Sequence, residues 1–206
     1  MKVLFLLLFP ALIFSQQLYT DSAGWINQKA DASTGVPTMI MYEHHEIHSG
    51  SHYYLDGYSS VGNGDTLVFF LQTPNTTKWA HMLYSFATSK ITTFEVFMSA
   101  DSIPKGATSI TPINSNHNYA NASVLTVAGG TSLNGVFPLA SLGTKIDSSK
   151  VGSSGARPSL KYGGAQSRGN ETVLKQNTIY VYMFISGEAA NTIDYLASWY
   201  EHTDKY

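Results

Sequence analysis

Apolar and polar residues alternate along much of this chain with the two-residue period of β-strands. Trp79 to Thr88 and Ile91 to Met98 alternate in this way, so each predicts a strand with one face in a core. Thr66 to Leu71 is a continuous bulky run between turn signals, which is typical of a strand buried on both faces. The spacing of these runs predicts an all-β fold, a jelly-roll-like antiparallel β-sandwich.

Shorter runs predict the remaining strands. They are Val124 to Ala128, Gly135 to Leu142, Glu171 to Lys175, Thr178 to Ser186 and Thr192 to Tyr200. The connection from Ser99 to Ser123 is long and weakly patterned, and loops of that length in compact domains often form interfaces. The Gly- and Ser-rich stretch from Ser141 to Gln166 predicts a segment that is mobile or ordered by a neighbour.

The stretch from Met39 to Leu55 is the richest in ionisable side chains. We expect a strand from Met39 to His48 that begins in the core and ends at a polar edge, followed by a hairpin through Ser49 to His52. Gly57 to Asp65 is turn-rich. Backbone pairing across the exposed edge would join two copies of the chain. The predicted subunit-interface residues are Met39, Met41, Glu43, His44, His45, His48, His52, Trp199 and His202.

On such a strand His44, Glu46 and His48 share a face, so two imidazoles and a carboxylate could meet a divalent ion. The alternative is a polar strand end in which the histidines are hydrogen-bonded at an interface. We favour the interface, because the helical HExxH spacing of zinc enzymes is absent. No cofactor and no metal ligand are therefore predicted.

Catalytic motifs are missing from the sequence. There is no G-x-S-x-G, and Gly152 to Gly155 does not sit at a strand-to-helix elbow. Charged residues make up 13% of the chain and the net charge is -2, so no basic cluster predicts binding to nucleic acid or to an anionic membrane. With no cysteine, the redox compartment cannot be inferred. We expect a protein that is not an enzyme.

The N-terminus predicts export. Lys2 precedes an apolar run from Val3 to Phe14, which is shorter than the roughly 20 residues that span a bilayer. Residues 1–17 are therefore predicted to be a signal peptide, with a retained hydrophobic segment as the alternative. Residues 18–37 are predicted to be a polar arm, and residues 38–206 the β-sandwich domain. Sequons at Asn75, Asn121 and Asn170 are candidate glycosylation sites on an exported surface.

Five segments together resemble a group of tailed-phage virion proteins of the head-decoration and head-fibre kind. They are YEHHEIHSGSHYYL, TPNTTKWAHMLYSF, NHNYANAS, ETVLKQNTIYVYMFISGEA and WYEHTDKY. The resemblance covers residues 38 to 206 and implies a β-sandwich module that assembles on a particle surface without catalysis. Two features depart from that group: the export signal, and His117 and Tyr119 where an arginine is usual.

The sequence thus predicts a non-catalytic protein that self-assembles, either as a secreted extracellular filament or sheath subunit or on a virion surface. Its main partner would be itself, with capsid or cell-surface components as further partners, and it would have no membrane contact after signal removal. The alternative is a secreted carbohydrate-binding module, whose sugar platform would use Tyr53, Tyr54, Tyr58 and Trp79.

Overall fold

The computed structural model describes residues 19–21, 24–26, 33–34, 42–132, 142–154, 163–165 and 171–203. The chain divides into two compact units, Met1–Met41 and Tyr42–Tyr206. In the first unit, β1 (Tyr19–Asp21) and β2 (Gly24–Ile26) form a two-stranded antiparallel sheet inside the arm that was predicted to be irregular. The predicted signal peptide, residues 1–17, lies outside the described residues. None of the described helices is long and apolar enough to cross a membrane.

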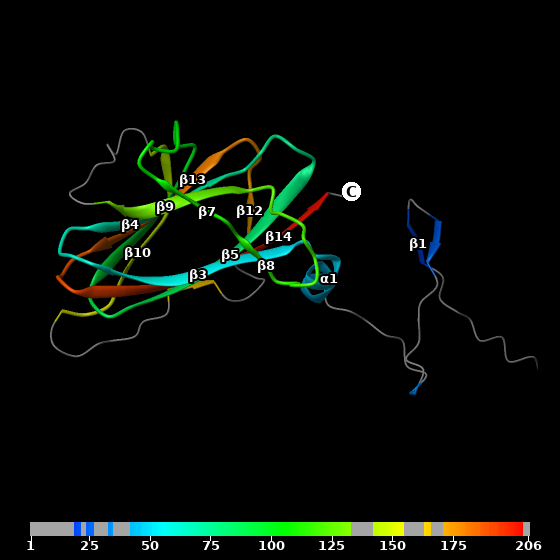
Figure 1. Ribbon diagram of the computed structural model, residues 1–206, viewed down its shortest axis with the longest axis horizontal. Coiled ribbons are helices and arrows are strands. Elements are labelled where there is room, and N and C mark those ends of the chain that lie inside the picture. The colour runs from blue at the N-terminus through cyan, green and yellow to red at the C-terminus, as the bar shows by residue number, and fades with distance from the viewer. Residues whose placement is uncertain are drawn as a thin grey trace, which may run out of the picture. The chain divides into compact units, whose positions relative to one another are not determined.

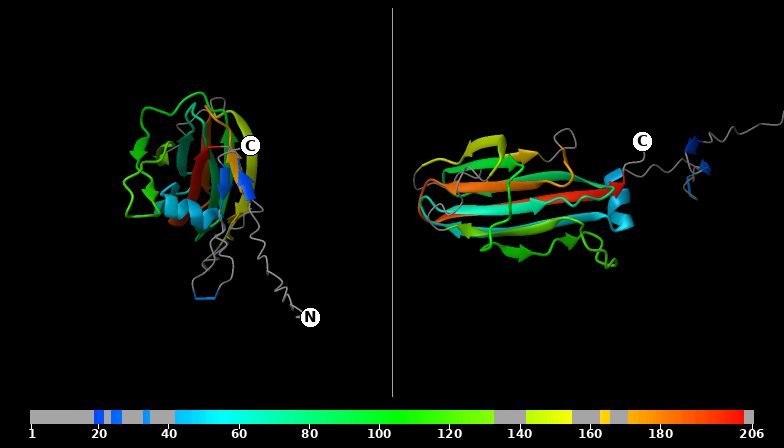
Figure 2. Two further views of the ribbon diagram at one scale, coloured as in Figure 1. Left: turned by 90° about the vertical axis from the view of Figure 1, so that its right-hand side faces the viewer. Right: turned by 90° about the horizontal axis from the view of Figure 1, so that it is seen from above.

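The second unit contains two antiparallel sheets that pack as a sandwich (Figures 1 and 2). In spatial order the first sheet consists of β10 (Thr144–Val151), β6 (Thr92–Met98), β13 (Ile179–Ser186), β4 (Thr66–Gln72), β9 (Thr126–Ser132) and β7 (Thr108–Ile110). The second consists of β11 (Gly163–Ala165), β5 (Lys78–Thr88), β14 (Asn191–Thr203), β3 (His52–Val61) and β8 (Ile113–Asn114), and β12 (Thr172–Leu174) also pairs with β5. We call them the β13 sheet and the β14 sheet.

The strand pairing confirms the predicted jelly-roll-like sandwich. The first sandwich strand, β3, pairs with the last, β14, and the second, β4, pairs with β13. The next two pairs inward are β5 with β12 and β6 with β10. Such nested pairing is what a long antiparallel hairpin produces when it wraps around a barrel-like core, and it alternates the strands between the two sheets. The strands β7 to β9 are an insertion between β6 and β10 that extends the opposite side of both sheets.

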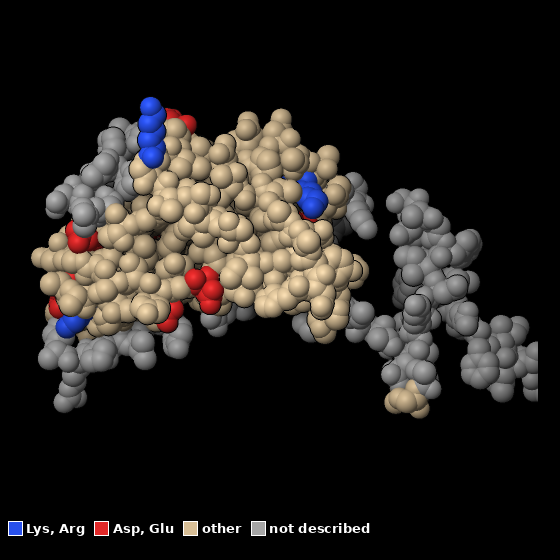
Figure 3. Space-filling model, viewed as in Figure 1, with Lys and Arg blue, Asp and Glu red and all other residues tan. Residues whose placement is uncertain are grey.

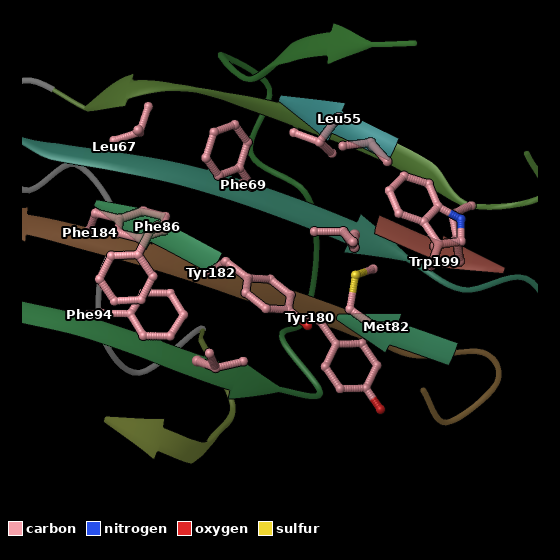
Figure 4. Packing of buried hydrophobic residues seen from close by; sticks show 14 of the residues in the cluster. Leu55, Leu67, Phe69, Met82, Phe86, Phe94, Tyr180, Tyr182, Phe184 and Trp199 are labelled. Carbon is pink, nitrogen blue, oxygen red and sulfur yellow. The ribbon is translucent and has the colours of Figure 1, made fainter. Parts of the chain in front are cut away.

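Aromatic side chains fill the space between the sheets (Figure 4). Phe86 and Phe94 have ring centroids 4.6 Å apart, and both contact Phe184, at 5.1 and 4.8 Å. Each such buried ring contributes about 1.5–3 kcal/mol to stability by leaving water. An apolar cavity of about 30 Å³ remains near Tyr84 and Tyr182, room for about one water molecule. Burial raises the pKa of the Tyr182 hydroxyl, which keeps it neutral.

A second apolar cluster lies on the outer face of the β13 sheet. It is formed by Val68, Phe70, Phe97, Ala100, Leu142, Val181 and Met183. The chain itself covers this face: after β6 the backbone N–H groups of Ser99 and Ala100 both donate to the Ile179 carbonyl, and Ile103 and Ala107 pack on the cluster. Burial on both faces explains why β4 and β13 are continuous apolar runs in the sequence.

The predicted strand from Met39 to His48 is wrong where the structure describes it, because Tyr42–Ser49 forms α1. Gly50, at φ +73°, ends this helix. The Gly50 N–H donates to the Ile47 carbonyl at 3.1 Å and the Ser51 N–H donates to the Glu46 carbonyl at 2.9 Å. These two bonds are the Schellman motif that closes helices. The Ser49–Gly50 break therefore marks a helix C-terminus rather than a hairpin turn.

One other expectation changes. The strand β3 continues through most of the expected turn to Val61, and the turn itself is Gly62–Asp65, where Asp65 accepts a hydrogen bond from the Gly62 N–H. The stretch predicted to be mobile or ordered by a neighbour contains β10, which is ordered by its backbone pairing with β6 and has no apolar pattern of its own. The predicted strand from Gly135 to Leu142 lies outside the described residues except for Leu142.

Candidate functional site

The predicted interface residues do not form one surface. His44, His45 and His48 are exposed on α1, while Met39, Met41 and the side chain of Glu43 lie outside the described residues. Trp199 was wrongly placed at an interface: it is 1% exposed, packs on Tyr53 in the core and donates its indole N–H to Glu201 at 3.0 Å. Alternation along β14 places Trp199 inward and its neighbours Tyr200 and His202 on the outer face.

The helix also separates the proposed metal ligands. His44 and His48 are one helical turn apart, with ring centroids at 4.6 Å, but Glu46 is buried against the sandwich at 5% exposure. The strand-based grouping of these three residues is therefore wrong. Across the described parts of the chain, no three His, Cys, Asp or Glu side chains are arranged to hold a metal ion.

The outer face of the β14 sheet is the largest surface that the predicted residues share. Strand register aligns Tyr54 with Ser198, Asp56 with Leu196 and Tyr58 with Asp194 on this face. In the middle of the face, Tyr58 is 79% exposed and Leu196 is 41% exposed. Tyr58 is a diagonal neighbour of Leu196 across the strand pair, within reach of a shared partner.

The predicted sugar platform is only partly assembled. Tyr54, Tyr58 and Trp79 lie on the outer face of the β14 sheet, whereas Tyr53 points into the core with 1% exposure. The Tyr53 hydroxyl donates to the carbonyls of Gly50 and Ala122, and burial, together with the Glu201 carboxylate, raises its pKa to about 12. Tyr53 is therefore a core residue and cannot contact a sugar.

A cluster of ring side chains lies at the end of the same outer face, where β5 meets β14. His81 on β5 stacks on Tyr200 of β14 with ring centroids 4.6 Å apart. Nε2 of His81 is 2.7 Å from Nε2 of His202. On its other side, Nδ1 of His81 contacts the Glu171 carboxylate, which also accepts a hydrogen bond from the Tyr200 hydroxyl at 2.7 Å. We call His81, Glu171, Tyr200 and His202 the imidazole cluster.

Sequence reasoning found only part of the imidazole cluster. His202 was predicted at an interface, but His81 and Tyr200 were not singled out. The only sequence signal for these residues was the alternation along their strands, which places His81, Tyr200 and His202 on the outer face. The cluster depends on the register of β5 against β14, which pairs His81 with Tyr200 and Trp79 with His202, and one sequence does not reveal that register.

A buried carboxylate lies on the opposite side of the same strand. Glu201 is 1% exposed and accepts hydrogen bonds from the Ser123 hydroxyl, the Val124 N–H and the Trp199 indole. These donors satisfy it fully, and they fix the end of the β7–β9 insertion to the sandwich. We interpret Glu201 as structural, since a carboxylate held by several donors is stable where it is.

The Asn-rich turn is tied to the end of α1. The Gly50 carbonyl accepts a hydrogen bond from the Asn114 amide at 2.9 Å, and the Asn116 amide donates to the His48 carbonyl at 3.3 Å. His52 makes two bonds to Ser115: its Nδ1 lies 2.6 Å from the Ser115 hydroxyl, and its carbonyl accepts the Ser115 N–H. These bonds continue the pairing of β3 with β8, so this Ser–His contact holds the turn in place.

Two of the three candidate glycosylation sites can be located. Asn75 is exposed in the turn between β4 and β5, and Asn121 is exposed next to the insertion. The Asn121 amide nitrogen lies 3.5 Å from the Gly50 carbonyl, a contact that a glycan would have to replace. Asn170 lies outside the described residues.

Comparison with known proteins adds no relative: no family model, no curated protein and no solved structure matches this chain. The resemblance to phage virion proteins stays a prediction.

Proposed function

We propose that this protein is a non-catalytic structural subunit that self-associates through the outer face of the β14 sheet. The observation that carries the proposal is a difference between the outer faces of the two sheets. The chain itself buries the outer face of the β13 sheet, but Tyr58 and Leu196 remain exposed on the outer face of the β14 sheet. Exposed tyrosine is typical of the central part of protein interfaces. Two carboxylates flank the pair, because Asp194 lies opposite Tyr58 and Asp56 lies opposite Leu196. Figure 3 views the sandwich from the side of β3, β7 and β8, where charged side chains are few and scattered.

Most of the described sheet edges favour association by a face over the edge pairing expected from the sequence, and β3 is the exception. The edge strand β10 carries Lys145 and Lys150 and has a register shift between Lys145 and Asp147. Lysine and bulges are devices that prevent another strand from adding to an edge. The other edge strands, β7, β8, β11 and β12, have three residues or fewer. They offer too few backbone groups for stable strand addition. The exception is β3: β8 pairs only with Tyr53 and Tyr54, so no described strand pairs with that side of β3 from Leu55 to Val61.

Non-catalytic function is supported by the structural roles of two polar groups. Glu201 is saturated by structural donors, and the His52–Ser115 contact extends a strand pairing. The interior cavity is about 30 Å³. A second hollow, of about 240 Å³, is lined by residues of β6, β10 and β13 that include Thr92, Lys150 and Ile185, and it too is smaller than the roughly 300 Å³ of ordinary ligand pockets.

The setting in which the subunit assembles is inferred from the N-terminus and the resemblance. The short apolar segment that follows Lys2 supports export, which suits an extracellular filament or sheath. The resemblance to head-decoration proteins supports a virion surface instead, with capsid components as partners. In both settings the sandwich presents one open face to a second copy.

A carbohydrate-binding module is the second candidate, favoured by one observation. Tyr54 and Tyr58 lie two residues apart on the same exposed face, where aromatic rings can stack on sugars. Trp79 lies on the far side of β14 from both, so the platform would contain only the two tyrosines. Glycan-array binding by a monomer would support this candidate over self-association.

The test is the mass of the purified full-length chain between about 1 and 100 µM, the range in which weak interfaces become occupied. Light scattering should show a mass that rises with concentration, and negative-stain electron microscopy should show regular particles or filaments. The variant Leu196→Arg should stay monomeric at every concentration, because it places a charge in the centre of the contact.

Ile146→Arg is the matched control. Ile146 is 46% exposed on β10, at the edge of the other sheet, so the same substitution should leave the mass profile unchanged. A wild-type chain that is monomeric throughout the range would contradict self-association. Equal loss of assembly in both variants would contradict the assignment to the β14 sheet.

A further inference from the structure

The geometry points to a transition-metal site formed by His81 and His202 on the outer face of the β14 sheet. We propose that these two imidazoles bind one divalent ion of the zinc or copper type through their Nε2 atoms. This pair is separate from the histidines of α1, and the site does not depend on self-association.

The hydrogen bonds on the far side of each ring determine which nitrogen carries the proton. Nδ1 of His81 contacts the Glu171 carboxylate, and Nδ1 of His202 lies 3.2 Å from the Thr203 carbonyl oxygen. An ionised carboxylate and a carbonyl can only accept hydrogen bonds. Both Nδ1 atoms are therefore the donors, and each neutral ring presents a lone pair at Nε2.

Those two lone pairs point at each other across 2.7 Å, with the ring planes tilted by 37°. Two lone pairs at this distance repel unless an electron-pair acceptor lies between them, either a proton, which makes the contact a hydrogen bond, or a metal ion. A cation bound to both nitrogens supplies that acceptor. With metal–nitrogen bonds of about 2.05 Å in tetrahedral geometry, the two nitrogens would be about 3.3 Å apart. The pair needs to open by only about 0.6 Å, and His202 lies one residue from the end of β14.

The surroundings are those of metal-binding histidines. Such histidines usually donate their second ring N–H to a carboxylate or a backbone carbonyl, which orients the ring and raises its basicity. Glu171 accepts the second N–H of His81 and is itself hydrogen-bonded by the Tyr200 hydroxyl. The Thr203 carbonyl accepts the second N–H of His202. The side chain of His81 is 17% exposed, which leaves a path for the ion.

Two protein ligands leave coordination positions open. Within the described residues no third His, Cys, Asp or Glu completes the set, so water would fill the remaining positions. Imidazole ligands suit zinc, copper and nickel, whereas magnesium and calcium prefer oxygen. The site should therefore bind Zn²⁺ and Cu²⁺ but not Mg²⁺ or Ca²⁺.

The experiment is a titration of the untagged full-length chain with Zn²⁺ by isothermal calorimetry, compared with His81→Ala and His202→Ala. We expect one ion per chain and an affinity at least tenfold lower in either variant. Thermal melting without metal would verify that each variant folds. The control is the double variant His44→Ala/His48→Ala, which removes the two imidazoles that lie next to each other on α1 and should leave the affinity for Zn²⁺ unchanged.

A second readout separates ligands from positioning residues. Electron paramagnetic resonance of bound Cu²⁺ should show coupling to two imidazole nitrogens, reduced to one in either single variant. Glu171→Gln should keep both nitrogens while lowering the affinity about 10–100-fold, as loss of a supporting carboxylate does. If Zn²⁺ fails to bind at millimolar concentration, or if only the α1 variant loses it, the proposal is wrong and the two rings share a proton instead.

Discussion

The outer faces of the two sheets differ in what covers them. On the β13 sheet, Phe70 and Val181 are at most 1% exposed, because the chain after β6 folds back over them. On the β14 sheet, Leu196 on the central strand and Tyr58 on the neighbouring strand β3 remain exposed to solvent. A jelly roll needs only one core between its sheets, so the second apolar cluster is an addition, and it stabilises the β13 side alone.

The comparison separates residues that specify the fold from residues free to serve function. The covered face is continuous apolar sequence, and each of its side chains has a packing role. The open face mixes Tyr, Asp, Ser and Leu with the imidazole cluster at one end. Substitutions on the first face should change stability, and substitutions on the second should change association or ligand binding.

The largest expected difference between the two faces is in the loss of stability when one aromatic ring is removed from each. Phe70→Ala should reduce the free energy of unfolding by about 3–5 kcal/mol, because it leaves a cavity in the covered cluster. Tyr58→Ala removes a ring that is 79% exposed and should change the free energy of unfolding of the monomer by no more than about 0.5 kcal/mol. Urea unfolding at low protein concentration measures both, and similar losses would contradict the difference between the faces.

Glu201→Gln tests the carboxylate that anchors the inserted strands. The amide replaces one acceptor oxygen with a donor facing the Val124 N–H, so we expect a loss of about 2–3 kcal/mol. The matched control is Glu188→Gln, whose carboxylate lies 3.9 Å from the Lys90 ammonium group and which should cost about 0–0.5 kcal/mol. Denaturant unfolding compares the two variants, and equal effects would show that Glu201 has no anchoring role.

Tyr53 should make the fold sensitive to alkaline pH. Its pKa is raised from 10.0 to about 12, so between these values the folded chain holds a proton that the unfolded chain has released. Stability therefore falls as pH rises from about 10 to 12 and is unaffected by this group below about pH 10. Tyr53→Phe should flatten that part of the curve of unfolding free energy against pH. Buried Tyr84 and Tyr182 shift in the same direction and would leave a residual slope.

A small loss of stability is expected at the rim of the covered face. Lys145 pairs with Glu95 at 2.5 Å and is half exposed, so Lys145→Ala should cost about 0.5–1 kcal/mol, with the loss shrinking at high salt. Unfolding at low and high ionic strength measures this. A loss above about 2 kcal/mol would show that β10 depends on the ion pair more than on its pairing with β6.

Much of the sandwich follows from the sequence. The alternation in Trp79 to Thr88 places Met82 and Phe86 inward, and the run from Thr66 to Leu71 is buried on both faces as predicted. These elements were predictable because tertiary packing of strands selects for apolar residues at defined intervals. The polar strand β10 was missed because its stability comes from backbone hydrogen bonds at an edge, which leave no side-chain pattern.

The site was less predictable for physical reasons. A stretch of alternating ionisable residues fitted a strand, but Gly50 ends a helix there, and the helix separates Glu46 from His44 and His48. Trp199 was predicted at an interface, but the alternation of side chains along β14 directs it into the core. The imidazole cluster joins residues 81, 171 and 202, and only the strand register brings them together.

Self-association through the open face can be tested most directly by hydroxyl-radical footprinting of the wild-type chain at low and high concentration. The account predicts that Tyr58 and Leu196 become protected as the mass rises, while Ile146 and Tyr119, which have similar exposure elsewhere, stay reactive. Assembled protein in which Tyr58 and Leu196 react as fast as in the monomer would contradict the account.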